Sequence, residues 1–324
     1  MPKSTAVRFR RGFRLTLPVL VASTVMAMTG APAFAAHGGH GGGGGGGGTG
    51  GSTTTGFDVS YPQCGTTLPT PTAFGIVGIN DGLANNLNPC LGPSSSYPSY
   101  AQSELYWAVS DSVGGTTQPD TSLYVNTADP GNIYNGKPIA DWPTSSLSTD
   151  PYGSCSTTTV SSRGHSYTVG QNSDACAWQY GYDGAVQDAS WLSSAADAID
   201  AQSPPKLVAN TSGSYSWWLD VETANSWQSD TTMNVADLQG MLTGLGVSAV
   251  TTVGVYSTSA QWNSITGGTT TAASGSLYQL PNWIPGATSE SQAASNCAES
   301  SFTNGHVALT QWTGTVDNDY PCPA

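Results

Sequence analysis

The chain has 324 residues, of which only 9% are charged, and its formal net charge is −13. Five of its eight Lys and Arg residues fall within the first 14 positions. The remainder holds three basic residues against 21 acidic ones, a net charge of −18. Such an acidic chain disfavours binding to nucleic acid or to an anionic membrane surface, because both attract basic proteins.

The N-terminal segment has the pattern of a secretory signal peptide. Basic residues up to Arg14 precede an apolar run over 15–28, and Ala33-Phe34-Ala35 follows as a small-x-small cleavage signature. The apolar run is too short for a comfortable membrane span, so we expect cleavage near Ala35 and no stable membrane insertion. Arg10-Arg11 leaves both the Sec and the twin-arginine export routes open. Residues 1–35 therefore predict a secreted, extracellular or cell-wall-associated protein.

Residues 36–55 are almost entirely Gly and Thr, including an unbroken glycine run over 41–48. Such a segment cannot bury enough apolar surface to fold, and it predicts a flexible linker. The rest of the chain, 56–324, contains no second linker and no repeat. Its length fits one α/β barrel domain, and we expect a monomer.

Short apolar strands alternate with helical patterns along this domain. Strands are predicted at 57–60, 74–80, 123–125, 215–222, 252–256, 280–284 and 307–312, with a short eighth at 315–317; helices are predicted at 100–110, 178–199 and 235–245, the last capped by Asn234. The alternation indicates the α/β class and a parallel sheet. With about eight strands, a closed (β/α) TIM-like barrel is favoured over an open doubly wound sheet.

An extended loop insertion follows the third predicted strand, over 127–177, and is rich in Gly, Ser, Thr and Pro. In a barrel this loop would lie at the C-terminal mouth, where active sites form. An even number of cysteines in an exported chain indicates disulfides. The chain contains no CxxC pair of the kind that binds zinc, so we expect no metal. The strand order favours pairing in sequence order: Cys64–Cys90, Cys155–Cys176 and Cys297–Cys322.

Carboxylates gather at the ends of several predicted strands. Side chains alternate along a strand, so Trp218, Asp220 and Glu222 point to one face, which we assign to the barrel interior. Asp58 ends the first strand, and either Asp317 or Asp319 could join it from the last strand. Acids side by side in a partly dry site hold a proton at raised pKa, as general acid catalysis requires. The alternative is that these acids only cap helices or bind loops.

Aromatic and amide side chains near the same strand ends are further candidates. Tyr256 and Trp283, like Trp218, could line a sugar-binding cleft or belong to the core. Gln311 and Asn80 could bond sugar hydroxyls, or could equally be buried amides that satisfy the backbone. The chain contains no serine-elbow motif and no histidine cluster that would indicate a different chemistry.

Five motifs occur in the order found in glycoside hydrolase family 25, the lysozyme-like muramidases. They are GFDVSYPQ at 56–63, WLDVE at 218–222, GVYS at 254–257, PNWI at 281–284 and QWTGTVD at 311–317. The chain resembles this family over its core strands. Two stretches differ from it: residues 78–82 read GINDG, and the 127–177 segment is unusually long.

The resemblance implies a secreted (β/α) barrel that hydrolyses β-1,4 bonds in peptidoglycan or a related glycan, with no cofactor. It implies Glu222 as the general acid/base and Asp220 as the residue that orients and stabilises the substrate's acetamido group. Asp58 and Asp317 would be supporting carboxylates. The alternative function, which the two differences motivate, is a barrel that binds cell-wall polysaccharide without cleaving it.

Overall fold

The computed structural model describes residues 54–59, 63, 65–70, 72–80, 86–111, 121–202, 208–268 and 277–323. All of them belong to the compact unit Gly51–Ala324. The predicted signal peptide, and the predicted linker up to residue 53, lie outside the described residues. Among the described helices, none combines the length and apolar character that a membrane span needs.

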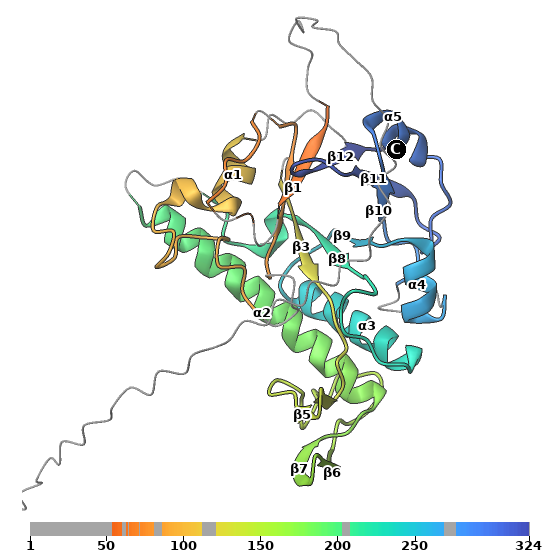
Figure 1. Ribbon diagram of the computed structural model, residues 1–324. Helices are drawn as coiled ribbons and strands as arrows, with labels where there is room; N and C mark the ends of the chain where they lie inside the picture. The colour runs from red at the N-terminus through yellow and green to blue at the C-terminus, as the bar shows by residue number, and fades with distance from the viewer. Residues whose placement is uncertain are drawn as a thin grey trace, which may run out of the picture. The chain divides into compact units, whose positions relative to one another are not determined.

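Eight strands close into a barrel in the order β1-β12-β11-β10-β9-β8-β3-β2 (Figure 1). Their bounds are β1 (Gly56–Val59), β2 (Gly75–Gly78), β3 (Thr121–Asn126), β8 (Ser216–Asp220), β9 (Val253–Tyr256), β10 (Asn282–Ala287), β11 (Val307–Trp312) and β12 (Asp317–Pro321). The predicted α/β class and closed barrel are confirmed.

The last strand departs from the predicted all-parallel arrangement. β12 pairs antiparallel with both β1 and β11, whereas the other neighbours in the barrel are parallel. Residues 315 and 316 of the expected short strand form a bend instead, and Asp317 begins β12. Only a few residues separate β11 from β12, which suits a hairpin and is too short for a helical crossover. Among the described residues no helix separates β1 from β2 either, so the (β/α) repeat is incomplete.

Helices follow most of the other strands. They are η1 (Tyr100–Gln102), α1 (Glu104–Asp111), α2 (Asp174–Asp200), η2 (Ser212–Ser214), α3 (Thr231–Val247), α4 (Ser259–Thr266) and α5 (Glu290–Asn296). The expected cap of α3 is wrong. Asp230 caps this helix by accepting from the Thr232 N–H, while Asn234 is fully buried and donates to the carbonyls of Gln228 and Ile265.

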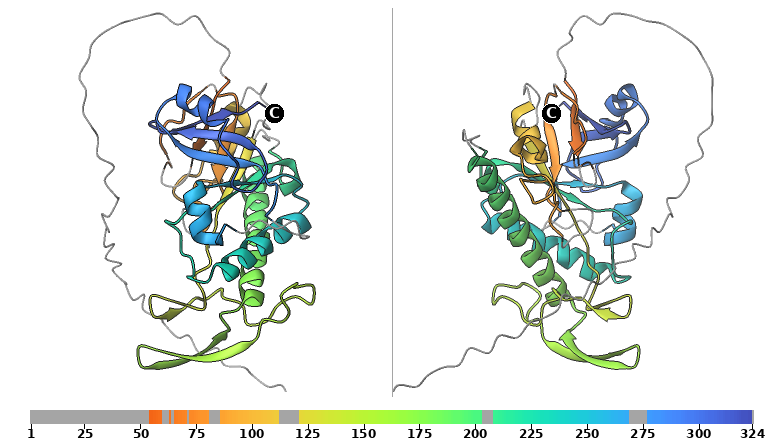
Figure 2. Two further views of the ribbon diagram at one scale, coloured as in Figure 1. Left: turned by 90° about the vertical axis from the view of Figure 1, so that its right-hand side faces the viewer. Right: turned by 60° about the vertical axis from the view of Figure 1, so that its left-hand side comes forward.

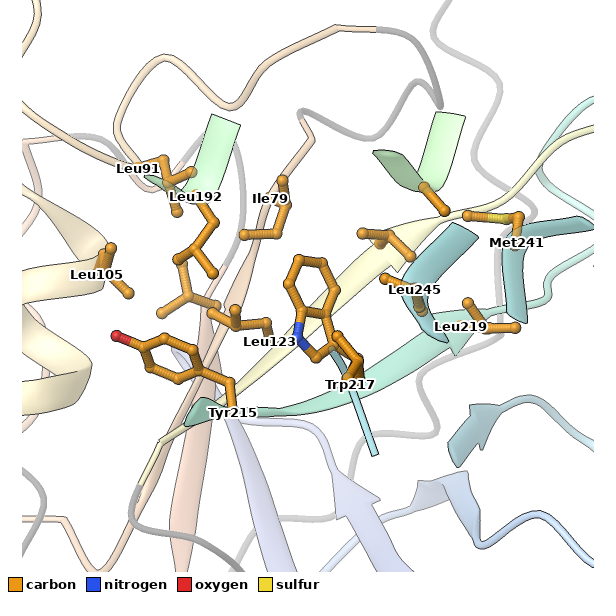
Figure 3. Close-up of a cluster of buried hydrophobic side chains, with 14 of the residues drawn as sticks. Ile79, Leu91, Leu105, Leu123, Leu192, Tyr215, Trp217, Leu219, Met241 and Leu245 are labelled. Carbon is orange, nitrogen blue, oxygen red and sulfur yellow. The ribbon is translucent and has the colours of Figure 1, made fainter. Parts of the chain in front are cut away.

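The two faces of β8 divide as the alternation predicts. Trp217, Leu219 and Val221 are fully buried and pack outward with Leu192 of α2 and Leu245 of α3 (Figure 3). Burying such large apolar side chains contributes roughly 1.5–3 kcal/mol each. This packing anchors the strand, and it leaves the alternate residues facing the barrel interior.

The segment between β3 and α2 is not a structureless loop. It contains two antiparallel hairpins, β4 (Ile133–Tyr134) with β5 (Lys137–Pro138) and β6 (Thr157–Ser162) with β7 (His165–Gly170). Figure 2 shows the β6–β7 hairpin extending away from the barrel. Backbone pairing within each hairpin satisfies polar groups that a plain loop would leave to solvent.

Two of the predicted disulfides form, Cys155–Cys176 and Cys297–Cys322. The first ties the hairpin segment to the start of α2, and the second ties the end of α5 to the end of β12. Cys90 is disulfide-bonded, but Cys64 lies outside the described residues. The Cys64–Cys90 pair therefore stays a prediction.

Candidate active site

A cavity of about 220 Å³ opens at the carboxyl ends of the parallel barrel strands. It is lined by Asp58, Tyr124, Asn126, Asp220, Glu222, Tyr256, Trp283, Gln311 and Asp317. Seven of the eight residues selected from the sequence for catalysis or substrate binding are in this set. The eighth, Trp218, is not. None of these nine described lining residues is basic, so none of them offers a cationic partner to the carboxylates.

The reversed direction of β12 brings Asp317 to this mouth. Antiparallel pairing places Asp317, the first residue of β12, opposite Asp58 near the end of β1. Asp319 lies two residues deeper and is fully buried, and its Oδ1 accepts a hydrogen bond of 2.8 Å from Trp283 Nε1. Of the two aspartates that the sequence left open, Asp317 lines the cavity and Asp319 supports its wall.

A directed hydrogen-bond chain orients Asp58. The Tyr256 hydroxyl donates to Gln311 Oε1 at 2.9 Å, which turns the amide so that Gln311 Nε2 donates to Asp58 Oδ2, also at 2.9 Å. Burial and the nearby charge of Asp317 raise the pKa of Asp58 to about 7, against the opposing effect of hydrogen bonds from Gln311 and Asp319. Asp58 therefore exchanges its proton near neutral pH.

Asp220 and Glu222 lie two residues apart on β8 and just beyond it, and they occupy different environments. Asp220 is only 8% exposed, and its Oδ1 has no hydrogen-bond partner among the described residues. Burial, then the charges of Glu222 and Asp58, raise its pKa well above the usual value. Glu222 is half-buried; burial raises its pKa, and a hydrogen bond from Gln261 acts in the opposite direction. Such a pair can hold a proton at a pH where an exposed carboxyl would be ionised.

The aromatic wall is built around Trp283. Its ring meets Tyr256 edge-on with centroids 4.6 Å apart, and it meets Tyr124 at 6.4 Å and Trp218 at 5.8 Å. Trp218 points into the barrel as predicted and packs against Trp283, but it is not among the residues that line the cavity. Of the two positions that the sequence left open for Trp218, the core position is therefore favoured.

Tyr124 and Asn126 are lining residues that sequence reasoning missed. They alternate on β3 as Trp218 and Asp220 do on β8, and this pattern was the available signal. Asn80 is fully buried, and its Oδ1 accepts from the Asn126 backbone N–H at 2.8 Å. The reading of Asn80 as a buried amide that satisfies the backbone is therefore favoured, since it holds the β3 end rather than facing the cavity.

No three His, Cys, Asp or Glu side chains in the described part of the chain are arranged to hold a metal ion. The chemistry that the arrangement offers is proton transfer and charge stabilisation by carboxylic acids. Amides and aromatic rings beside them are suited to binding hydroxyl groups and flat apolar faces.

Fold and site together define a mixed α/β barrel whose mouth holds a cluster of carboxylates. Residues 195–300, about a third of the chain, match the family model described as lysozyme-like protein 1. The resemblance to lysozyme-like proteins is confirmed over this segment, which contains Asp220, Glu222, Tyr256 and Trp283. No curated protein matches the chain.

Two solved structures are also similar. One is a muramidase from Trichobolus zukalii, with 13% identity, 84% of this chain and 95% of that chain covered, and a TM-score of 0.43. The other is a bacterial lysozyme from Streptomyces coelicolor, with 13% identity, 84% and 94% covered, and a TM-score of 0.42.

Proposed function

We propose that this protein is a secreted glycoside hydrolase of the family 25 type, cleaving β-1,4 bonds in peptidoglycan or a related glycan. The observation that supports this most is the convergence of Asp58, Asp220, Glu222 and Asp317 from three strands on one cavity. The lysozyme-like match over 195–300 supports the same reaction class, because it spans two of these acids.

Glu222 is the general acid in this proposal. It is the more exposed member of the β8 pair, so it can reach a glycosidic oxygen, and its raised pKa favours the protonated form needed to donate. Once the leaving group departs, the ionised Glu222 can accept a proton from the attacking water. Donation and recovery by one residue is the behaviour of a retaining glycosidase.

In this proposal the proton that the pair holds is on Glu222, and the ionised Asp220 stabilises the positive charge that develops at the anomeric carbon. It lies deeper than Glu222 and its Oδ1 is free of hydrogen bonds from the described residues, so this oxygen can turn to the substrate. Its partner is either the substrate's acetamido group, in a substrate-assisted reaction, or the anomeric carbon itself. In either role the Asp220 carboxylate acts from the face of the sugar opposite the leaving group.

The remaining wall binds the sugar. Asp58 and Asp317 accept from sugar hydroxyls, and the Asp58 charge raises the pKa of Asp220. Tyr256 and Trp283 provide flat apolar surface for a pyranose face. In this proposal the partner is a polysaccharide outside the cytoplasm, and the protein acts as a monomer without a cofactor.

The test is reducing-end release from purified peptidoglycan by residues 36–324, beside Glu222→Gln and Glu299→Gln. Glu299 lies on the surface after α5 and away from the cavity, so it is the matched control. We expect wild-type and Glu299→Gln to release sugar equally. Glu222→Gln should lose about 100-fold or more in kcat with an unchanged melting temperature, as removal of a general acid does.

Absence of release by folded wild-type protein on peptidoglycan, chitin and related glycans would contradict the proposal. Co-sedimentation with insoluble peptidoglycan under those conditions would instead favour a barrel that binds the polymer without cleaving it.

A further inference from the structure

Three helices begin with the pattern Ser/Thr-x-x-Gln, which ordinarily indicates a capping box with a local role for the glutamine. In each pair the first residue caps the helix and the glutamine lies in its first turn: Ser99 and Gln102 at η1, Thr258 and Gln261 at α4, and Ser289 and Gln292 at α5. In each of them the hydroxyl accepts a backbone N–H of the first turn. The three glutamines occupy the same position after the cap, Gln102 in a 3-10 helix and Gln261 and Gln292 in α-helices, and their side chains go to different partners.

Two of the glutamines remain local. Gln102 Oε1 accepts from the Ser99 N–H at 3.4 Å, closing the box. Gln292 Oε1 accepts from the Thr288 N–H at 2.9 Å, one residue before the cap. Neither residue lines the carboxylate cavity.

Gln261 instead reaches across to the end of β8. Its Oε1 accepts from the Thr223 backbone N–H at 2.6 Å and from the Thr223 hydroxyl at 3.2 Å. Two donors on the oxygen fix which end of the amide faces them. The NH₂ group is consequently turned toward Glu222, and Nε2 lies 3.4 Å from Glu222 Oε1.

The geometry points to Gln261 as a positioning residue that holds the Glu222 carboxyl in one orientation from outside the cavity. This inference rests on the proposed function, in which Glu222 is the proton donor. Thr258 Oγ1 fixes the Gln261 backbone by accepting its N–H at 3.2 Å. Gln261 is therefore held at its backbone by Thr258 and at its side-chain oxygen by Thr223. Within the described part of the chain, Gln261 provides the only side-chain hydrogen bond to the Glu222 carboxylate.

Among the described residues that line the cavity with Glu222, the titratable groups are all acids or phenols. They are Asp220 on β8, Tyr124 on β3, Tyr256 on β9, Asp58 on β1 and Asp317 on β12. A negative charge on any of these carboxylates disfavours ionisation of Glu222. The Gln261 amide acts against burial and lowers the Glu222 pKa, since an N–H donor stabilises the anion. Gln261 thus tunes the residue as well as orienting it.

Two substitutions separate positioning from a merely structural role. Gln261→Leu removes the donor to Glu222 and also the acceptor for Thr223. Gln261→Glu keeps an acceptor for the Thr223 N–H but turns a carboxylate oxygen toward Glu222. If Gln261 only supports Thr223, Gln261→Glu should behave like the wild type. If Gln261 positions the Glu222 carboxyl, Gln261→Glu should be altered as Gln261→Leu is. Gln292→Leu and Gln292→Glu are the matched controls at the same helix position.

The quantity measured is the pKa of Glu222, obtained from a ¹³C NMR titration of protein labelled at the glutamate carboxyl carbon. The chain has only four glutamates, and the Glu222→Gln spectrum assigns the signal. We expect the Glu222 pKa to rise by about half a unit in Gln261→Leu and by more in Gln261→Glu, from loss of a donor and gain of a like charge. Both Gln292 variants should leave it unchanged.

The pH profile of glycan hydrolysis should move upward by the same amount in the Gln261 variants, with kcat lowered more than KM is raised. A Glu222 pKa that is unchanged in folded Gln261→Glu overturns the inference. A shifted pKa in a protein that hydrolyses no glycan contradicts the proposed function alone, because the NMR titration does not depend on turnover.

Discussion

Two groups of buried acids differ in what surrounds them. The carboxylates at the barrel mouth converge on a cavity of about 220 Å³. The second group, Asp129, Asp188 and Asp237, lies beside helices α2 and α3, and each of its members is at most 1% exposed. Asp188 and Asp237 border a space of only about 10 Å³, which is room for one water molecule.

Their proton affinities do not distinguish the two groups. Burial raises the pKa of Asp188 and of Asp237 well above the usual value, and it raises that of Asp129 to about 6. The mouth acids are raised for the same main reason. A raised carboxyl pKa therefore identifies burial. A candidate active site needs, in addition, several acids around a space that a sugar ring can enter.

Neutralising one acid from each group should distinguish the two groups most clearly. Asp220→Asn should lower kcat on peptidoglycan by about 100-fold or more, because it removes the carboxyl group that stabilises the positive charge developing at the anomeric carbon. Asp188→Asn, which changes an even more buried carboxyl, should change kcat less than twofold. Similar losses in both variants, each with a native circular dichroism spectrum, would show that burial and not convergence explains the activity.

The second expected effect is on stability against pH. Glu104 is 1% exposed, and burial raises its pKa from 4.5 to about 7, while that of Asp129 rises from 3.8 to about 6. Between about pH 4 and pH 7 the folded protein keeps protons that the unfolded chain releases, so stability must fall as pH rises. One unit of pKa corresponds to about 1.4 kcal/mol, so Glu104 alone accounts for on the order of 3 kcal/mol.

Urea unfolding at pH 4.5 and pH 8 measures this difference. Glu104→Gln should reduce the difference in unfolding free energy between the two pH values, because an amide does not titrate and can still accept a hydrogen bond from Asn88. Equal free energies of unfolding at the two pH values would mean that these acids are not held protonated in the folded state.

A smaller effect is expected at Asp237, whose two carboxylate oxygens have no hydrogen-bond partner in the part of the chain that the structure describes. Asp237→Asn should be nearly neutral at pH 4.5 and stabilising at pH 8, because the amide never pays the cost of an ionised buried group. The matched control is Asp141→Asn, at an exposed position. Thermal unfolding of both variants at the two pH values tests this, and destabilisation of Asp237→Asn at pH 8 would contradict it.

Much of the barrel and its site could be predicted because strand alternation is a local property. Trp217 and Leu219 face the helices, and Asp220 and Glu222 face the cavity, as the period of two requires. The same rule gave the inward face of Trp218 but left its place in the cleft or the core open, because alternation gives the face of a strand and not the depth along the barrel axis. Trp218 lies one inward-facing position below Asp220, where the interior is filled by other rings.

Other features depend on parts of the chain that are distant in sequence. The antiparallel direction of β12 follows from how the barrel closes, so no pattern within 315–321 indicates it. Gln261 read alone predicts a capping box, and only the position of Thr223 diverts its side chain toward Glu222. The hairpins within 127–173 were missed because their strands are short or polar and have few buried residues.

That hairpin segment contributes no side chain to the cavity, and the Cys155–Cys176 bond closes it onto the first turn of α2. Sequence change in the segment and selection on the carboxylates are thereby uncoupled. Its outer turns can lengthen, shorten or be exchanged while the geometry of the barrel mouth stays fixed. For engineering, residues 157–170 are accordingly a grafting site where a new binding loop can be added to an unchanged barrel.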